Sequence, residues 1–459
     1  MATLRAMAYP DILQAYANRK LDQRIRDASI KDGNAVLLTG HGSLLTREDG
    51  SLVVEFITNG RYGDFVKECN PGEIAFPTAE PVLEAHMEDG NRLRAHVSYF
   101  SPSSWTEAGG RIIFSPWEVE IHVLHPVKSI PYVKALLTPF KTEIANTSSS
   151  VKDDNPMFGH EELRYWLKID LDRASVGLRK EESGLCWLSF AEQGTKSPDV
   201  VKHVEAFLIA LSFLVGEAVS LLAFTTSIDG AEVIRLRQPD KKQKGLVEHP
   251  LPMDHFGRRF GKPESDVLIK GTTFFQANAY VGHWLMLCWN AAGGYSPTQY
   301  LVVSSVVESL AKFITKEAPQ AMTLKPEKEK FDKFKTACMT VLQNQENTKN
   351  SEYIQRILNR INSTDYLRSE DSIKKAGQIV RPGAPIEISD DEISAWKKLR
   401  NPTTHGDFQT GQTSEVSILK QMRQHECCVN IINKLVLGLI GYKGPFRDYS
   451  KPNYPNGTL

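Results

Sequence analysis

The sequence lacks the short motifs of the common phosphate-binding and metal-dependent enzymes. No P-loop, no GxGxxG after a strand, no GxSxG and no HExxH occurs in its 459 residues. It also lacks a CxxC pair, because its six cysteines are scattered. Cys427 and Cys428 are adjacent in a helical pattern, where a mutual disulfide would strain the backbone. We therefore expect reduced thiols, as is typical of a cytosolic protein.

An excess of charge and long apolar runs are also missing. Lys and Arg number 55, as do Asp and Glu, so the formal net charge is zero. This balance excludes a uniformly basic coat for nucleic acid, although a local electropositive site remains compatible with it. The most apolar stretches, Phe207–Phe224 and Cys427–Ile440, are interrupted by polar residues, and the first residues contain no apolar run of signal-peptide length. We expect a cytoplasmic protein that does not contact a membrane.

What is present is enough apolar material for more than one core. Hydrophobic residues make up 41% of the chain and aromatic residues 9%, and a chain of this length folds as two or three domains. The patterns predict a multidomain α+β protein. The expected domains are a β-rich region over residues 1–150, a mixed α/β region over 151–290 and a helical domain over 296–459.

The pattern of the first region predicts β-hairpins. Asp49-Gly50 and Asp89-Gly90 are typical of hairpin turns, because the glycine tolerates positive φ. The runs that flank them are Ser43–Thr46 with Ser51–Ile57, and Val82–His86 with Leu93–Val97. Glu118–Val123 alternates polar and apolar residues, which predicts a strand with one buried face. His122 and His125 form an HxxH, but three residues along a strand they face opposite sides, so we expect no metal site.

The middle region mixes strand and helix signals before the helices begin. Strands are expected near Arg164–Ile169, Leu185–Phe190, Leu221–Thr225 and Val233–Leu236, with a helix around Val200–Leu214 and a loop over Gln238–Pro263. After Pro297 the apolar residues Tyr300, Val303, Val307, Leu310 and Ile314 fall at helical spacing. Further helices are expected at Pro326–Gln343, Tyr353–Ile361, Ser389 to about Arg400, and Ser414–Ile440. The start at Ser389 is predicted by a capping box, Ser389-Asp390-Asp391-Glu392.

The helix that begins at Ser389 ends in an unusual residue. Arg400 lies four and seven residues after Trp396 and Ile393, so it shares the apolar face of this helix. An arginine on a packed face needs a partner, which is a carboxylate, a second subunit or a bound phosphate. Pro402 disfavours continued helix at Asn401, so we expect the chain to turn there.

Arg400, Asn401 and His405 are residue types that suit metal-free RNA cleavage. This reaction deprotonates a 2′-hydroxyl, stabilises charge on the phosphorane and protonates the leaving oxygen. His405, with an ordinary pKa of about 6.5, exchanges protons near neutral pH. The guanidinium of Arg400 holds two phosphate oxygens at once, and the amide of Asn401 orients the phosphate or the histidine. One histidine cannot be both acid and base, but two subunits would supply a pair.

The pattern Arg-polar-x-x-x-His before the last helix of an all-α domain resembles the HEPN superfamily over Ser296 to Tyr449. Many of its members are metal-independent endoribonucleases that dimerise so that two motifs form one site. A β-rich region ahead of such a domain resembles the ApeA-type antiphage HEPN proteins. The resemblance implies a homodimeric endoribonuclease of antiviral defence or abortive infection, with no metal or cofactor. Its substrate would be RNA, such as tRNA, and a phage-derived or host trigger would be sensed by the N-terminal region.

The resemblance also implies that Glu308 contacts the catalytic arginine or histidine; the alternative is a solvated helix acid. Lys397, Tyr442, Lys443 and Arg447 are candidates for RNA contact by charge and stacking, whereas the alternative for the C-terminal residues is a packing tail. Two other functions fit the sequence. One is a HEPN fold that binds nucleotide or RNA without cutting it. The other is an adaptor whose helical domain only dimerises.

Overall fold

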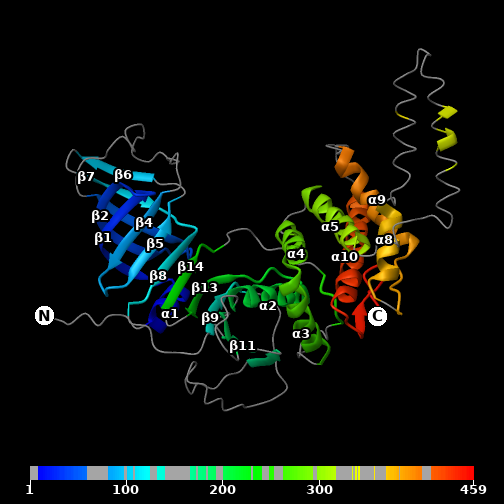
Figure 1. Ribbon diagram of the computed structural model, residues 1–459, viewed down its shortest axis with the longest axis horizontal. Helices are drawn as coiled ribbons and strands as arrows, with labels where there is room; N and C mark the ends of the chain where they lie inside the picture. Colours follow the sequence, from blue (N-terminus) through cyan, green and yellow to red (C-terminus); the bar gives the residue numbers. More distant parts are fainter. Residues whose placement is uncertain are drawn as a thin grey trace. The chain divides into compact units, whose positions relative to one another are not determined.

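One antiparallel sheet organises the N-terminal half of the chain, and helices organise the C-terminal half (Figure 1). The structure is a computed structural model. It describes residues 9–58, 81–97, 101–106, 109–124, 132–139, 166–171, 174–181, 185–192, 200–228, 231–239, 248–252, 262–292, 297–316, 333, 336–338, 340–341, 356, 369–381, 383–405 and 415–459. The chain divides into two compact units. Unit 1 comprises Met1–Leu211, Val219–Lys242 and Asp254–Ser265, and unit 2 comprises Ser212–Ala218, Gln243–Met253 and Asp266–Leu459.

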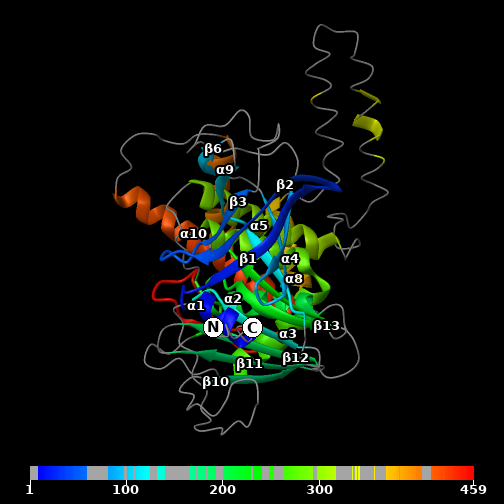
Figure 2. The same ribbon diagram turned by 90° about the vertical axis from the view of Figure 1, so that its left-hand side faces the viewer.

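Unit 1 is built on a sheet of 14 strands in the order β10-β11-β12-β9-β13-β14-β8-β5-β4-β1-β2-β3-β7-β6. The strands are β1 (Asp22–Asp32), β2 (Ala35–Thr46), β3 (Leu52–Thr58), β4 (Val82–Met87), β5 (Arg92–His96), β6 (Ser101–Thr106), β7 (Gly109–Phe114), β8 (Glu118–His122), β9 (Tyr132–Leu137), β10 (Trp166–Leu171), β11 (Ala174–Lys180), β12 (Cys186–Glu192), β13 (Leu221–Ile228) and β14 (Ala231–Arg237). Figure 2 shows that the sheet twists between the part around β1 and the part around β11.

Both predicted hairpins are confirmed. Next to the first turn, Thr46 at the end of β2 pairs with Leu52 at the beginning of β3. Next to the second turn, His86 of β4 pairs with Arg92 of β5. The glycines of their turns, Gly50 and Gly90, have φ of 83° and 87°, which is the conformation that these sequences favour.

His41 lies within β2 between two glycines. A Cβ at Gly40 would lie 2.0 Å from the carbonyl oxygen of Ile57, and one at Gly42 would lie 1.9 Å from that of Glu55. The two glycines therefore allow β3 to approach β2 more closely than any side chain would permit.

The sheet passes through both of the regions that we expected to be separate. β8 pairs with β14, and β9 pairs with β12 and β13, so strands before residue 150 alternate with strands after it. Residues 142–156, around the expected boundary at 150, lie outside the described residues. The first two expected regions thus contribute strands to one sheet, although residues 212–218, 243–253 and 266–290 belong to unit 2.

The core of unit 1 lies on the inner face of the sheet. Helix α1 (Tyr9–Ala17) buries Ile12, Leu13 and Tyr16 against it, and the hydroxyl of Tyr16 donates to the carbonyl of Arg237 at 2.5 Å. Helix α2 (Val200–Val215) packs on the sheet through His203, whose ring stacks on Phe190 of β12 with centroids 6.2 Å apart. The predicted helix at Val200–Leu214 is confirmed.

Unit 2 is mainly helical in its described part, with one small sheet. Its helices are α3 (Lys262–Ala277), α4 (Ala279–Ala291), α5 (Pro297–Lys316), α8 (Ser369–Ile379), α9 (Asp390–His405) and α10 (Glu415–Leu439). β15 (Pro445–Arg447) and β16 (Asn456–Thr458) form a two-stranded sheet, so the expected all-α character is incomplete. α3 and α4 also begin before the expected start at 296. Most of the helices predicted at Pro326–Gln343 and Tyr353–Ile361 lie outside the described residues.

The capping box predicted at Ser389 is present and has a second role. The Ser389 hydroxyl accepts from the Glu392 backbone N–H at 3.2 Å, and the Glu392 carboxylate accepts from the Ser389 N–H at 2.8 Å. The same carboxylate is fully buried and lies 3.0 Å from the ammonium of Lys434 on α10. Asn430 donates to it at 2.8 Å. One acidic side chain therefore both begins α9 and joins it to α10.

The C-terminal tail is tied to the same group of side chains. Asn430 donates to the Asp448 carboxylate at 3.0 Å and accepts from the Tyr449 backbone N–H at 3.0 Å. Tyr449 also donates its hydroxyl to the carbonyl of His249 at 3.0 Å. Among the helices that the structure describes, none is long and apolar enough to cross a bilayer.

Replacing Lys434 with Met should destabilise unit 2 by about 3–5 kcal/mol, because it leaves a fully buried carboxylate without its cation. Faster hydrogen exchange of the α9 and α10 amides would report this loss. Lys398→Met, at an exposed position of α9, is the control and should leave exchange unchanged. The double change Glu392→Gln with Lys434→Met should recover part of the protection. Unchanged exchange in Lys434→Met would contradict the importance of the buried pair.

Candidate functional site

The predicted site lies where α9 packs against α5. The indole N–H of Trp396 donates to the carbonyl of Ser304 at 3.0 Å, and both residues are buried. Four residues further along each helix, Glu308 on α5 meets Arg400 on α9. The equal spacing on the two helices is one helical turn, so the Trp396–Ser304 contact sets the register in which the charged pair forms.

Arg400 is held on two sides. Its Nε lies 3.2 Å from Oε2 of Glu308, and its guanidinium carbon lies 5.6 Å from the centre of the Trp396 ring. The side chain remains 33% exposed. Of the three partners that the sequence left open for this arginine, the structure supplies a carboxylate. The expected contact between Glu308 and Arg400 is present, and it fixes the arginine at the surface of the helical unit.

Glu308 is itself surrounded by donors. The hydroxyl of Ser369, the first residue of α8, donates to it at 2.9 Å, and the ammonium of Lys312 lies 3.2 Å away. Burial acts to raise the pKa of Glu308, but the hydrogen bonds from Ser369 and Lys312 and the charge of Arg400 together hold it below its ordinary value. Glu308 is therefore a carboxylate at neutral pH, and three helices meet around it. Sequence analysis missed Ser369 and Lys312; only Lys312, at the i+4 position, carried a signal.

The end of α9 corrects one prediction. We expected the chain to turn at Asn401, but the helix continues through Pro402 to His405. Proline inside a helix removes the hydrogen bond of its own N–H and crowds the carbonyl four residues earlier, but an X-Pro step is a bias rather than a fixed boundary. Asn401 and His405 are four residues apart and so lie one turn apart on the same side of the backbone helix. Arg400 and His405 are separated by about 7 Å along the axis.

The four residues expected to contact RNA are not brought together. Lys397 is exposed on α9, and its ammonium lies 2.9 Å from the carboxylate of Glu370 on α8. Tyr442 is only 2% exposed, and its hydroxyl donates to the carbonyl of Pro445. Burial excludes base stacking on Tyr442, so the expected RNA contact by this ring is replaced by a packing role. Lys443 is exposed, and Arg447 lies over the rings of Tyr449 and Tyr454.

The tail that carries Tyr442, Lys443 and Arg447 is attached near the beginning of α9. Its Asp448 reaches Asn430, which in turn reaches Glu392 in the first turn of that helix. Arg400 lies eight residues further on, about 12 Å along the axis. The candidate site therefore comprises Glu308, Lys397, Arg400, Asn401 and His405, without the tail.

The comparisons with known proteins assign no relative. No protein-family model and no curated protein matches the chain. Among the described residues, no group of three or more His, Cys, Asp or Glu side chains is arranged to hold a metal ion.

The lowered pKa of Glu308 has a consequence for acid stability. A carboxyl group whose pKa is depressed by folding stabilises the folded state above its unfolded pKa, and this contribution is lost as the pH falls through the folded value. The effect of one partly exposed pair is about 1 kcal/mol or less. The protection factors of the α5 and α9 amides, which are corrected for slower intrinsic exchange in acid, should therefore fall below about pH 4.5, and Glu308→Gln should show less of this acid dependence. Glu387→Gln, at an exposed position, should behave as wild type; equal acid dependence in all three proteins would refute this role of Glu308.

Proposed function

We propose that the chain is a metal-independent endoribonuclease of the HEPN type, with its chemistry at Arg400 and His405. One observation supports this most strongly: Arg400, anchored by Glu308 and Trp396 yet 33% exposed, lies on the same helix as His405 and one and a half turns before it. Phosphodiester cleavage without a metal requires at least a permanently charged group and a group that exchanges protons, and α9 carries both residue types.

The reaction follows from the residue types. The 2′-hydroxyl oxygen of the RNA attacks the adjacent phosphorus while a histidine takes its proton. The bond from phosphorus to the 5′-oxygen breaks, and a second histidine gives a proton to that oxygen. The products are a 2′,3′-cyclic phosphate and a 5′-hydroxyl. Arg400 holds the phosphoryl oxygens as negative charge develops on them, and Asn401 orients the phosphate or the imidazole.

A second copy of the chain completes this mechanism. Each copy contributes one His405, and two are needed to act as base and acid. Lys397, Lys443 and Arg447 would add charge for the RNA, although only Lys397 lies on the helix that carries the site. Glu308 is a positioning residue in this mechanism, because it acts through Arg400 rather than on the RNA.

The wider assignment follows the same proposal. A homodimeric ribonuclease of this type fits a cytoplasmic defence effector that cleaves RNA, with tRNA as a candidate substrate. Its N-terminal unit would sense a phage-derived or host trigger and restrain the nuclease until then. This part rests on the resemblance to the antiphage HEPN proteins, an analogy of fold and function.

RNA cleavage in EDTA by purified wild type and by His405→Ala is the direct test. Bulk tRNA and total RNA should be cut by wild type, and the new 3′ ends should carry a cyclic phosphate. The variants His405→Ala and Arg400→Ala should each lose at least about a hundredfold in rate, the scale of a general acid–base or oxyanion contribution. His283→Ala removes an exposed histidine of α4 and should retain full activity.

Three outcomes would count against the proposal. Equal cleavage by wild type and His405→Ala would reject His405 as catalytic. Activity in a protein that stays monomeric by light scattering would reject the two-copy site. RNA binding that depends on Arg400, with no product even when residues 296–459 are expressed and tested for toxicity in cells, would favour the alternative of a binding module.

A further inference from the structure

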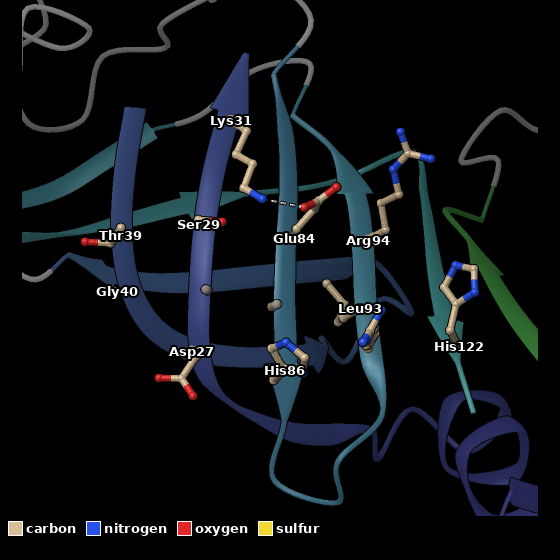
Figure 3. Close-up of a pocket in the computed structure, with 13 residues that line it drawn as sticks. Asp27, Ser29, Lys31, Thr39, Gly40, Glu84, His86, Leu93, Arg94 and His122 are labelled. Carbon is tan, nitrogen blue, oxygen red and sulfur yellow. Dashed lines mark hydrogen bonds and ion pairs between the residues drawn. The ribbon is translucent and has the colours of Figure 1, made fainter. Parts of the chain in front are cut away.

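The outer face of the sheet in unit 1 carries a pocket of about 600 Å³. It lies over β2, β1, β4, β5 and β8, and Figure 3 shows its polar side chains rising from neighbouring strands. A volume of this size is in the range of sites for small organic ligands. The residues that line it are Asp27, Ala28, Ser29, Lys31, Thr39, Gly40, Glu84, Ala85, His86, Arg92, Leu93, Arg94 and His122.

The strand register arranges the charged side chains in two rows across the sheet. In the first row, Glu84, Arg94, Glu120 and Arg235 stand opposite one another on β4, β5, β8 and β14. Their charges alternate in sign, and Arg235 Nε lies 2.8 Å from Glu120. Lys31 binds Glu84 at 2.8 Å. This row neutralises itself and leaves little attraction for a ligand.

Carboxyl pKa values show the same neutralisation. Arg94 contributes to a lowered pKa at both Glu84 and Glu120. At Glu84 the hydrogen bond from Lys31 is the main cause. At Glu120 burial acts upward but is outweighed by Arg235 and the other nearby cations. Arg94 is thus compensated by a carboxylate on each side.

The second row is different. Asp27, His86, Arg92 and His122 stand opposite one another on β1, β4, β5 and β8. Arg92 is therefore flanked by two imidazoles instead of two carboxylates, and its side chain has no hydrogen bond or ion pair with any residue that the structure describes. His122 lies 3.7 Å from Glu120 of the first row. Directly opposed side chains lie about 5 Å apart, so one anion can touch Arg92 and both rings.

The other end of the row has the opposite character. Asp27 lies two strands from Arg92, about 10 Å away. On the same side of the pocket, Ser29 and Thr39 stand opposite each other on β1 and β2, in line with Glu84 of the first row, and add two hydroxyls (Figure 3). A carboxylate and two hydroxyls bind hydroxyl and amino groups but repel a second phosphate. This pattern selects a ligand with one anionic end and one polar, uncharged end. A continuous track of phosphates would need cations along the whole row.

We propose that this pocket binds a phosphorylated small molecule of nucleotide size, with its phosphate at Arg92, His86 and His122 and its hydroxyl or amino groups at Asp27, Ser29 and Thr39. A mononucleotide has these two ends at this separation. The proposal concerns unit 1 and is independent of whether unit 2 cleaves RNA.

Calorimetric titration of the full-length protein with each of the four ribonucleoside 5′-monophosphates, and with inorganic phosphate, tests this site. At least one nucleotide should bind about tenfold more tightly than inorganic phosphate. Arg92→Gln should weaken that binding by about tenfold or more, since it removes a charge-assisted, bidentate contact. Arg24→Gln is the matched control, because Arg24 is an exposed arginine of the same sheet outside the pocket and its loss should leave binding unchanged.

The side chain of Arg92 is exposed, so its replacement should leave the circular dichroism spectrum and melting temperature as in wild type. No binding by any of the nucleotides at millimolar concentration, or binding that survives Arg92→Gln, would overturn the proposal. Equal affinity for nucleotides and inorganic phosphate would reduce the site to one for a free phosphate. Tighter binding of a single-stranded RNA through Arg92 would make it an RNA-binding surface instead.

Discussion

The helical unit depends on one buried carboxylate. Glu392 caps the helix that carries Arg400, binds Lys434 and accepts from Asn430, which also holds the C-terminal tail. A charged group with no exposed surface is tolerated only when every oxygen has a donor, and here both oxygens do. The geometry of α9 relative to α10 is fixed by this requirement, so the direction in which α9 presents Arg400 is fixed too.

Trp396 and Arg400 show that one turn of α9 can be buried and packed while the next presents a charge to solvent. Trp396 is buried and anchored to Ser304, while Arg400, one turn later, is partly exposed and rests on its ring. The packing of Trp396 thus sets the position of the Arg400 guanidinium, which remains accessible to solvent. Placement of a functional side chain by packed neighbours is more precise than placement on a loop.

Local signals predicted those elements whose causes are local. The hairpins followed from Asp-Gly turns, β8 from strict alternation, and the start of α9 from its capping box. β1 gave no clear signal, because register shifts between Ile25 and Ala28 and between Ile30 and Lys31 interrupt its alternation. Pairing of β8 with β14 joins residues more than a hundred positions apart, which no local pattern encodes. For the site, the spacing of Trp396 and Arg400 predicted that they share one face of α9. The contact of Ser369 with Glu308 and the attachment of the tail had no signal in the sequence.

Strand order has a consequence for how the protein is made. β14 lies between β13 and β8, so the inner face near Ile121 stays open until residues 231–237 have left the ribosome. Contacts between such distant segments form slowly. About half of the chain must therefore be synthesised before the first core can close, and α9, with Arg400, is translated only after that point. The order of translation thus favours completion of the sheet before α9 and its Arg400 have been synthesised.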